Sequence, residues 1–364
     1  MKQCTIVIRD EVNIRLEGLD LDTRRALVKQ FKYDVPYARY LPAVRLGRWD
    51  GKVSFFQLGG STYTNLLPEI LPTLERFDWD VALDDQRSYA TTFQFTPVTE
   101  QTFAHHTWPD RHPQQGQPIL LRDYQVEIIN NFLANPQCIQ EVATGAGKTL
   151  VTAALSASVQ SYGRSIVIVP SKDLVRQTEA DYINMGLDVG VLFGDRKVYN
   201  RTHTICTWQS LNILLKNTKN SAADVTIMEF LEGVVCVMVD EVHMAKADVL
   251  KNLLTQNLCN APIRWGLTGT VPKDDLAFES IKCALGDVVH RVSAYDLQQK
   301  GVLSECHVNI VQTQEWKEFE SYPAELKFLV SDEDRMSWVA KLVNSIKDSG
   351  NTLVLVDRID TGNF

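Results

Sequence analysis

A glycine-rich turn between an apolar run and a helical run constrains this chain more than any other feature. Its small residues, Gly145, Ala146 and Gly147, let successive backbone N–H groups face an anion without a side chain in the way. The apolar run 138–142 before the turn is typical of a strand, and the Ala- and Leu-rich run 150–160 after it is typical of a helix. This order directs a helix N-terminus at the anion. The segment therefore predicts an α/β fold with a phosphate site.

The residues around the turn offer the groups that a nucleoside triphosphate needs. Lys148 is placed to contact the β- and γ-phosphates, Thr149 to offer a hydroxyl to Mg²⁺, and Thr144 to complete the loop. The usual phosphate-loop pattern has Gly where this chain has Val142. The motif alone therefore leaves a second interpretation open, in which the turn only caps a helix and Lys148 is solvated.

A pair of carboxylates follows a second apolar run. Residues 234–239 are continuously apolar, as in a strand buried in a parallel sheet. Asp240 and Glu241 come at its C-terminal end, where ligands bind in open α/β sheets. Asp240 is suited to hold Mg²⁺, and Glu241 to orient and deprotonate an attacking water. A lone Asp-Glu pair after a strand is usually an ordinary loop, but its place after a phosphate loop favours a catalytic role.

Residues 239–243 resemble the Asp-Glu-x-His motif of the superfamily 2 helicases, and further segments resemble the motifs of this family in its order. These segments are 121–125 (adenine recognition), 166–177 (motif Ia), 205–211 (motif Ib) and 267–270 (motif III). The resemblance implies a RecA-like motor lobe that uses ATP and Mg²⁺. It also implies that the Tyr124 ring stacks on adenine and that Gln125 bonds the edge of the base.

The same resemblance implies roles that spacing alone does not reveal. Ser171 and Thr207 would contact the nucleic-acid backbone, and His243 would couple the hydrolysis centre to motif III. The residues implied to link the ATP site to strand movement are Thr268, Gly269 and Thr270. Structural alternatives remain open: Ser171 also suits the N-cap of a helix, His243 a structural histidine with its hydrogen bonds satisfied, and Thr268 a turn.

A short element near the N-terminus narrows the resemblance. Residues 45–52 are similar to the Gly-x-Trp-Asp-Gly-basic element of the UvsW-type helicases of tailed phages. This likeness implies remodelling of branched DNA in recombination and repair, by branch migration, fork regression and R-loop removal. The DNA-contacting residues expected from it are Arg45, Arg48, Trp49 and Lys52.

The charge distribution agrees with a nucleic-acid partner. The net charge is −8, yet residues 24–52 hold eight basic against two acidic residues, with aromatic residues between them. Such a segment offers partners for phosphates and rings for exposed bases. The alternative is a surface helix whose basic face is solvated. The expected partner is branched or forked DNA, or an RNA–DNA hybrid.

The composition indicates a cytoplasmic protein, in the host cytoplasm if a phage encodes it. No apolar run approaches the length of a membrane span, and the first residues lack the apolar stretch of a signal peptide. The seven cysteines show no Cys-x-x-Cys spacing, which indicates reduced thiols and argues against a zinc site. We expect no membrane partner.

The pattern of elements predicts five segments. Residues 1–93 mix short strands with two helices, which predicts a small α+β accessory domain that binds DNA. Residues 94–118, rich in Pro, His and Gln, predict a linker. Residues 119–312 alternate strands and helices, which predicts the ATP-binding, RecA-like lobe with its parallel sheet covered on both faces. Residues 313–350 predict a helical connector and hinge, and 351–364 the first strand of a second lobe.

The expected strand at the end of the chain suggests a C-terminally truncated motor. The second lobe of this family supplies an arginine finger, which contributes about 10³ to 10⁵ in rate in phosphoryl-transfer enzymes. We therefore expect an ATP-dependent DNA helicase whose isolated chain binds ATP but turns it over slowly, with a second chain as a candidate source of the missing lobe. Two alternatives stay open: a branched-DNA binding module controlled by nucleotide without turnover, and the motor portion of a restriction or defence complex.

Overall fold

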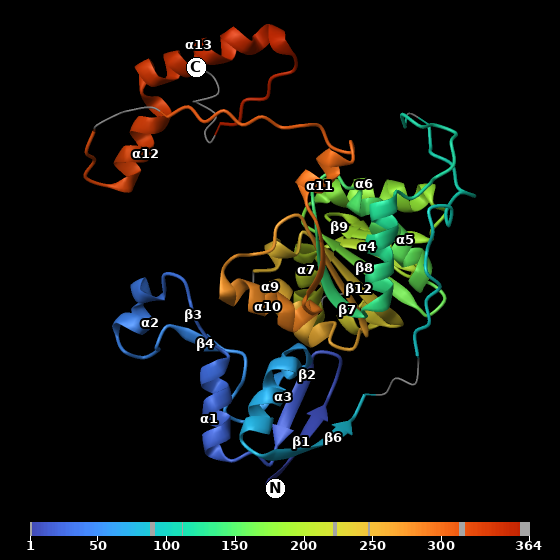
Figure 1. Cartoon of the computed structure of the whole chain (residues 1–364), viewed down its shortest axis with the longest axis vertical. Coiled ribbons are helices and arrows are strands. Elements are labelled where there is room, and N and C mark those ends of the chain that lie inside the picture. The colour runs from blue at the N-terminus through green and yellow to red at the C-terminus, as the bar shows by residue number, and fades with distance from the viewer. Residues whose placement is uncertain are drawn as a thin grey trace. The chain divides into compact units, whose positions relative to one another are not determined.

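The computed structural model describes residues 2–87, 92–110, 112–220, 224–246, 248–312 and 317–356. The chain forms two compact units, Met1–Glu305 and Cys306–Phe364. The first unit holds a small N-terminal sheet and a large parallel sheet, and the second unit holds helices (Figure 1).

The N-terminal part of the first unit is an α+β domain, as its sequence pattern predicts. Its sheet has the order β5-β2-β1-β6, with β1 (Lys2–Ile8), β2 (Asn13–Glu17), β5 (Ser61–Tyr63) and β6 (Trp79–Asp85). Helices α1 (Leu21–Gln30) and α3 (Leu67–Arg76) bury Leu27 and Leu74 against the sheet. The sequence pattern does not predict strand β6. It is an edge strand that pairs with β1 through its backbone and buries little beyond Trp79.

A small hairpin extends from this domain. Strands β3 (Lys32–Asp34) and β4 (Lys52–Ser54) pair in antiparallel register. The chain between them contains the 3₁₀ helix η1 (Ala38–Tyr40) and the short helix α2 (Pro42–Arg45). Figure 1 shows that this segment lies to one side of α1 and α3.

The large sheet has the order β10-β9-β11-β8-β12-β13-β7-β14, and all its neighbours pair in parallel except β10 with β9. This confirms the predicted α/β class and the RecA-like parallel sheet. The strands are β7 (Gln137–Val142), β8 (Arg164–Val169), β9 (Val189–Phe193), β10 (Arg196–Lys197), β11 (His203–Thr207), β12 (Val234–Asp240), β13 (Ile263–Thr268) and β14 (Val288–Val292).

Helices cover both faces of this sheet. One layer contains α4 (Asp123–Ala134), α5 (Lys148–Val159) and α6 (Lys172–Asn184). The other contains α7 (Trp208–Lys219), α8 (Ile227–Leu231), α9 (Asp248–Asn252) and α10 (Asp275–Leu285). Helix α11 (Ala294–Gln299) follows the last strand. Figure 1 shows the two layers on opposite sides of the sheet.

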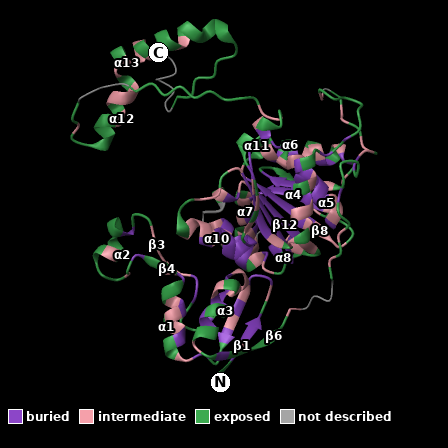
Figure 2. Ribbon diagram, in the orientation of Figure 1, coloured by how far each residue is buried: buried purple, intermediate pink, exposed green. Residues whose placement is uncertain are grey.

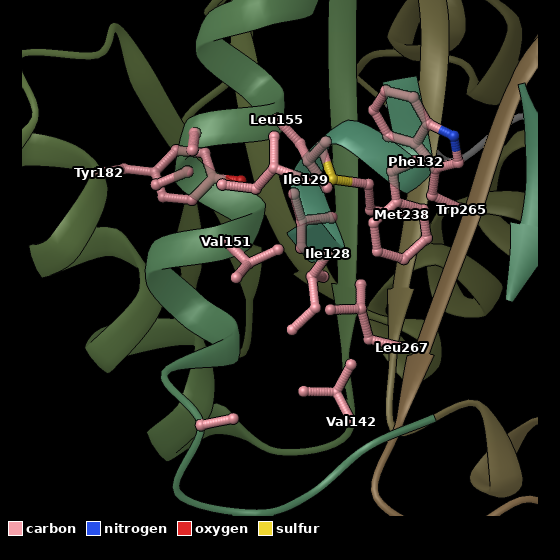
Figure 3. Close-up of a cluster of buried hydrophobic side chains, with 14 of the residues drawn as sticks. Ile128, Ile129, Phe132, Val142, Val151, Leu155, Tyr182, Met238, Trp265 and Leu267 are labelled. Carbon is pink, nitrogen blue, oxygen red and sulfur yellow. The ribbon is translucent and has the colours of Figure 1, made fainter. Parts of the chain in front are cut away.

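Strand β12 shows why its sequence is continuously apolar. Because successive side chains point to opposite faces, Met238 packs into the core under α4 and α5, and Val237 and Val239 pack into the core under α7 and α10. Figure 3 shows Met238 in the first core beside Phe132 and Trp265, whose ring centroids lie 5.7 Å apart. Both faces of the strand are therefore buried, and its carboxyl end alone reaches a ligand site.

Residues 94–118 differ from the linker that their composition predicts. Val98 and Phe103 are buried in the core of the large sheet, and the backbone N–H of Val98 donates to Oδ1 of Asn130 on α4. Thr107 and Pro118 form an antiparallel bridge that closes a loop. A composition rich in Pro and His describes irregular backbone, but it does not say whether that backbone packs against a neighbour.

The N-terminal domain packs at the N-terminal ends of the large sheet's strands. The Nε2 of Gln137, the first residue of β7, donates to the Glu11 backbone oxygen at 3.0 Å. Asn13 donates to the Thr255 oxygen at 2.9 Å, and Cys283 of α10 is buried in the N-terminal domain's core. The docking site is therefore at the edge of the sheet opposite the carboxyl ends of the strands.

The second unit contains α12 (Tyr322–Ser331) and α13 (Glu333–Ile346), both within the segment 313–350 that the sequence predicts to be helical. The strand expected from residue 352 is a wrong prediction, because 351–356 have no regular structure and are exposed. An apolar run becomes a strand only when another strand satisfies its backbone. The rest of the expected second lobe, 357–364, lies outside the described residues. Among those that are described, no helix combines the length and apolar character that a membrane span requires.

Candidate nucleotide-binding site

The glycine-rich turn connects β7 to α5 at the carboxyl edge of the sheet. Gly145 and Gly147 have φ values of 88° and 81°, in the left-handed region that favours glycine. A Cβ on Gly147 would also lie 2.7 Å from Nε2 of Gln125. Gly147 is the N-cap of α5, so the first N–H groups of this helix open toward the turn. Val142, where the usual pattern has Gly, is a buried core residue.

Lys148 lies close to the two carboxylates at the C-terminal end of β12. Its Nζ is 2.6 Å from Oε1 of Glu241 and 4.0 Å from Oδ1 of Asp240. The Lys148 side chain is only 9% exposed, and that of Glu241 is 21% exposed. The phosphate loop and the acidic pair, far apart in the sequence, therefore meet at one point, because β7 and β12 both end at the same edge of the sheet.

The two carboxylates differ in their surroundings. Burial raises the pKa of Asp240, and the nearby Lys148 ammonium opposes this shift. Glu241 has a φ of 54°, which is uncommon for a residue with a side chain. Such backbone strain costs on the order of 1–3 kcal/mol and persists where the surrounding structure holds it, often at functional sites.

His243 joins the acidic pair to the C-terminal end of β13. Its Nδ1 lies 3.0 Å from Oγ1 of Thr268 and 3.4 Å from Oε2 of Glu241. The Thr268 hydroxyl in turn donates to the Thr270 backbone oxygen at 2.9 Å. A Cβ on Gly269 would lie 3.2 Å from Oγ1 of Thr144, so this glycine lets the segment approach the phosphate loop closely.

Tyr124 and Gln125 form hydrogen bonds to the backbone of the glycine-rich turn. The Tyr124 hydroxyl donates to the Ala146 oxygen at 3.1 Å, and Nε2 of Gln125 donates to the same oxygen at 3.0 Å. Oε1 of Gln125 accepts the backbone N–H of Arg122. Tyr124 is only 2% exposed, so its ring is not free to stack on adenine as expected. The sequence identified the right segment, but the packing of α4 under the loop decided what its side chains do.

A cavity of about 1390 Å³ opens beside the phosphate loop, which is larger than a small-molecule pocket usually is. One part of its wall is formed by Gly145, Gly147 and Thr149. Another part is formed by Trp108 and His112, whose rings stack 4.0 Å apart. The sequence analysis missed this pair because both residues lie in the expected linker; an aromatic residue among prolines was the available signal.

Comparison with known proteins agrees with these motifs. Residues 118–273 match the protein family described as "Type III restriction enzyme, res subunit". The ATP-dependent DNA helicase UvsW of Enterobacteria phage T4 is 21% identical over 352 residues, which cover 91% of this chain and 66% of that protein. The DNA 3′-5′ translocase XPB2 of Sulfurisphaera tokodaii is 28% identical over 184 residues, half of this chain and 38% of that protein.

Solved structures show the same fold. A crystal structure of the UvsW helicase from bacteriophage T4 has a TM-score of 0.62 and 17% identity, and covers 79% of this chain and 99% of its own. A second T4 UvsW structure, at the same TM-score, covers 99% of this chain and 71% of its own. The chain is similar to the UvsW-type helicases of superfamily 2. It spans slightly less than two thirds of the length of the T4 protein and less of the other relative.

Two of the expected superfamily 2 DNA contacts are helix N-caps. The Ser171 hydroxyl accepts the Leu174 N–H of α6 at 3.3 Å, so Ser171 is the N-cap of this helix, as the structural alternative has it. Its side chain is nevertheless exposed on the surface. Thr207 is buried, and its hydroxyl accepts the Ser210 N–H of α7 at 3.4 Å. Thr207 lies opposite Val169 in the sheet, so both caps lie at one edge. The buried Thr207 side chain is therefore not available to contact a nucleic-acid backbone as expected.

The UvsW-like element near the N-terminus separates into two kinds of residue. Arg45, Arg48 and Lys52 are exposed, as a phosphate contact requires. Trp49 is half-buried, and its indole N–H donates to the Lys52 backbone oxygen at 2.9 Å, so it shapes the turn. Lys52 also pairs with Asp34 at 3.0 Å.

Proposed function

We propose that this chain is part of an ATP-dependent DNA helicase or translocase that remodels branched DNA, by branch migration, fork regression and R-loop removal. One observation carries the proposal: an unbroken series of contacts runs from Lys148 through Glu241 and His243 to Thr268. The series joins the residue expected at the phosphates to the residue expected at the attacking water. It then continues to Thr268, which belongs to the segment expected to link the ATP site to strand movement.

The phosphate loop fits a nucleoside triphosphate. Its glycines keep side chains out of the anion's place, and the N-terminus of α5 directs N–H groups at it. Lys148 reaches the phosphates once it leaves Glu241. Glu241 is then free to orient a water molecule and accept its proton. Nucleotide binding and the release of Glu241 are therefore one event in this proposal.

Thr149 and Asp240 would hold Mg²⁺, because hydroxyl and carboxylate oxygens suit this ion and it usually takes only one or two protein ligands together with phosphates. Bound Mg²⁺ supplies neutralisation of the charge on the phosphates. Burial raises the pKa of Asp240, and a neighbouring cation favours its charged form. His243 contacts both Glu241 and Thr268, which suits it to report proton transfer at Glu241 to motif III.

DNA as the partner is supported by the relatives, which are named a DNA helicase and a DNA translocase. The exposed Arg45, Arg48 and Lys52 offer positive charge for its phosphates. In the proposed mechanism, changes at motif III move the lobe along the DNA backbone, which Ser171 contacts from its exposed cap position.

ATP hydrolysis with and without branched DNA tests the proposal, with nucleotide binding recorded on the same samples. We expect ATP binding that Lys148→Ala abolishes, and slow turnover that Glu241→Gln abolishes while binding remains. Turnover that is unchanged in Glu241→Gln would refute the assigned chemistry. DNA and ATP binding that are coupled without any turnover would favour the second candidate, a nucleotide-controlled DNA-binding module.

A further inference from the structure

The segment between β3 and β4, residues 35–51, carries a group of exposed aromatic and apolar side chains. Side chains that usually lie in a core are exposed on it: Tyr37 is 79% exposed, Leu46 64% and Tyr40 58%. Figure 2 shows this segment as mostly exposed. Clustered exposed apolar side chains of this size indicate an interaction surface.

The segment is nevertheless held in one shape by its own contacts. The Val35 N–H donates to the Gly51 oxygen at 2.9 Å and closes its base, and the Arg48 N–H donates to the Ala43 oxygen at 2.9 Å. Ala38 is buried against Gly51, where an added Cβ would lie 3.0 Å from the Ala38 Cβ. The rings are therefore exposed on a folded element.

Tyr37 adopts a backbone conformation that stability alone does not explain. Its φ is 60° and its ψ is 8°, in the left-handed region, where glycine is unstrained and a tyrosine is not. The exposed ring gains little from packing to offset this cost. Strain of this kind is retained where a side chain must be presented in a fixed direction.

The charge around the rings is positive and available. Within the described part of the chain, Arg39, Arg45 and Arg48 form no ion pair with a carboxylate. The two acidic neighbours are already neutralised, since Asp34 pairs with Lys52 and Asp50 with Lys32. The guanidinium of Arg39 lies 4.8 Å from the centre of the Tyr40 ring.

Flat exposed rings beside unpaired arginines match the chemistry of unpaired nucleotides, which offer a base to stack on and a phosphate to bind. We propose that residues 35–51 bind the unpaired bases where a DNA duplex opens. Tyr37 and Tyr40 stack on these bases, and the arginines hold the flanking phosphates. The inference rests on the proposed function, because it names the part of a branched DNA that this domain recognises.

The test measures the affinity of the full chain for two DNAs of equal length, a fork with unpaired arms and a blunt duplex. The variants are Tyr37→Gly and Tyr40→Ala, with Leu83→Ala as a control for an exposed apolar side chain on the same domain. Tyr37→Gly removes the ring and relieves the backbone, so its melting temperature should equal or exceed that of the wild type. Binding of an ATP analogue by each variant confirms an intact motor lobe.

We expect each tyrosine variant to bind the fork about 10-fold more weakly, with duplex binding and ATP-analogue binding unchanged and the control like wild type. Fork binding that is unchanged in both variants would overturn the inference and would indicate a partner other than DNA for the rings. An equal loss on fork and duplex would also overturn it. If the wild-type chain binds neither DNA, the proposed function fails as well, which separates the two results.

Discussion

The ion pair between Lys148 and Glu241 should make nucleotide binding weaker than the phosphate loop alone would allow. Lys148 must leave the Glu241 carboxylate, 2.6 Å away, before it can contact a phosphate. Replacing this carboxylate by an amide keeps the shape of the side chain and removes its charge. We therefore expect Glu241→Gln to bind a non-hydrolysable ATP analogue more tightly than wild type.

The size of the effect follows from the surroundings of the pair. A hydrogen bond to a charged group contributes about 1.5–3 kcal/mol, and the amide oxygen of the glutamine still accepts from the Lys148 ammonium, so only part of this energy is lost. Asp240, 4.0 Å from the same ammonium, also keeps part of the attraction. The net gain is then about 1 kcal/mol, or roughly fivefold in the dissociation constant.

Isothermal titration with the analogue and Mg²⁺ measures this difference, because no turnover interferes in either protein. Glu75→Gln, on the exposed face of α3, is the matched control, since it removes one negative charge away from the site. Its affinity should equal that of wild type. Equal or weaker binding by Glu241→Gln would show that the pair does not oppose the nucleotide, and the proposed release of Glu241 would be refuted.

Two further predictions concern the cavity and the core. Trp108→Ala should weaken ATP binding about 10-fold, by loss of a stacking ring, and leave inorganic tripolyphosphate binding unchanged. Gln101→Ala in the same segment is its control, and equal losses for both ligands would exclude a base contact by Trp108. Burial lowers the pKa of His203 to about 4 from an ordinary value of 6.5. Between these pH values the unfolded chain binds more protons than the folded one, so this group makes stability fall as pH falls. In urea titrations, His203→Asn should therefore lose less stability than wild type between pH 7 and 4. If the free energies of unfolding of the two proteins fall in parallel over this range, the lowered pKa of His203 is contradicted.

The glycine-rich turn and the acidic pair could be predicted from the sequence, because each depends on a local pattern of residues. A strand, a glycine turn and a helix specify a phosphate loop, and a continuously apolar strand specifies burial on both faces of a sheet. Lys148 and Glu241 could therefore be predicted as partners in one site. Likewise, α12 and α13 lie within the segment 313–350 that was predicted to be a helical connector.

The tertiary structure alone decided which side chains remain available. The aromatic ring of Tyr124 could stack on a base, but the packing of α4 against the glycine-rich turn buries it. Trp108 lies in a segment that composition predicts as linker, yet a buried anchor at Phe103 brings it to the cavity wall. Among the N-terminal aromatics, only the fold separates the core ring of Phe31 from the exposed ring of Tyr37. Burial depends on which distant elements pack together, and no local pattern of residues encodes that.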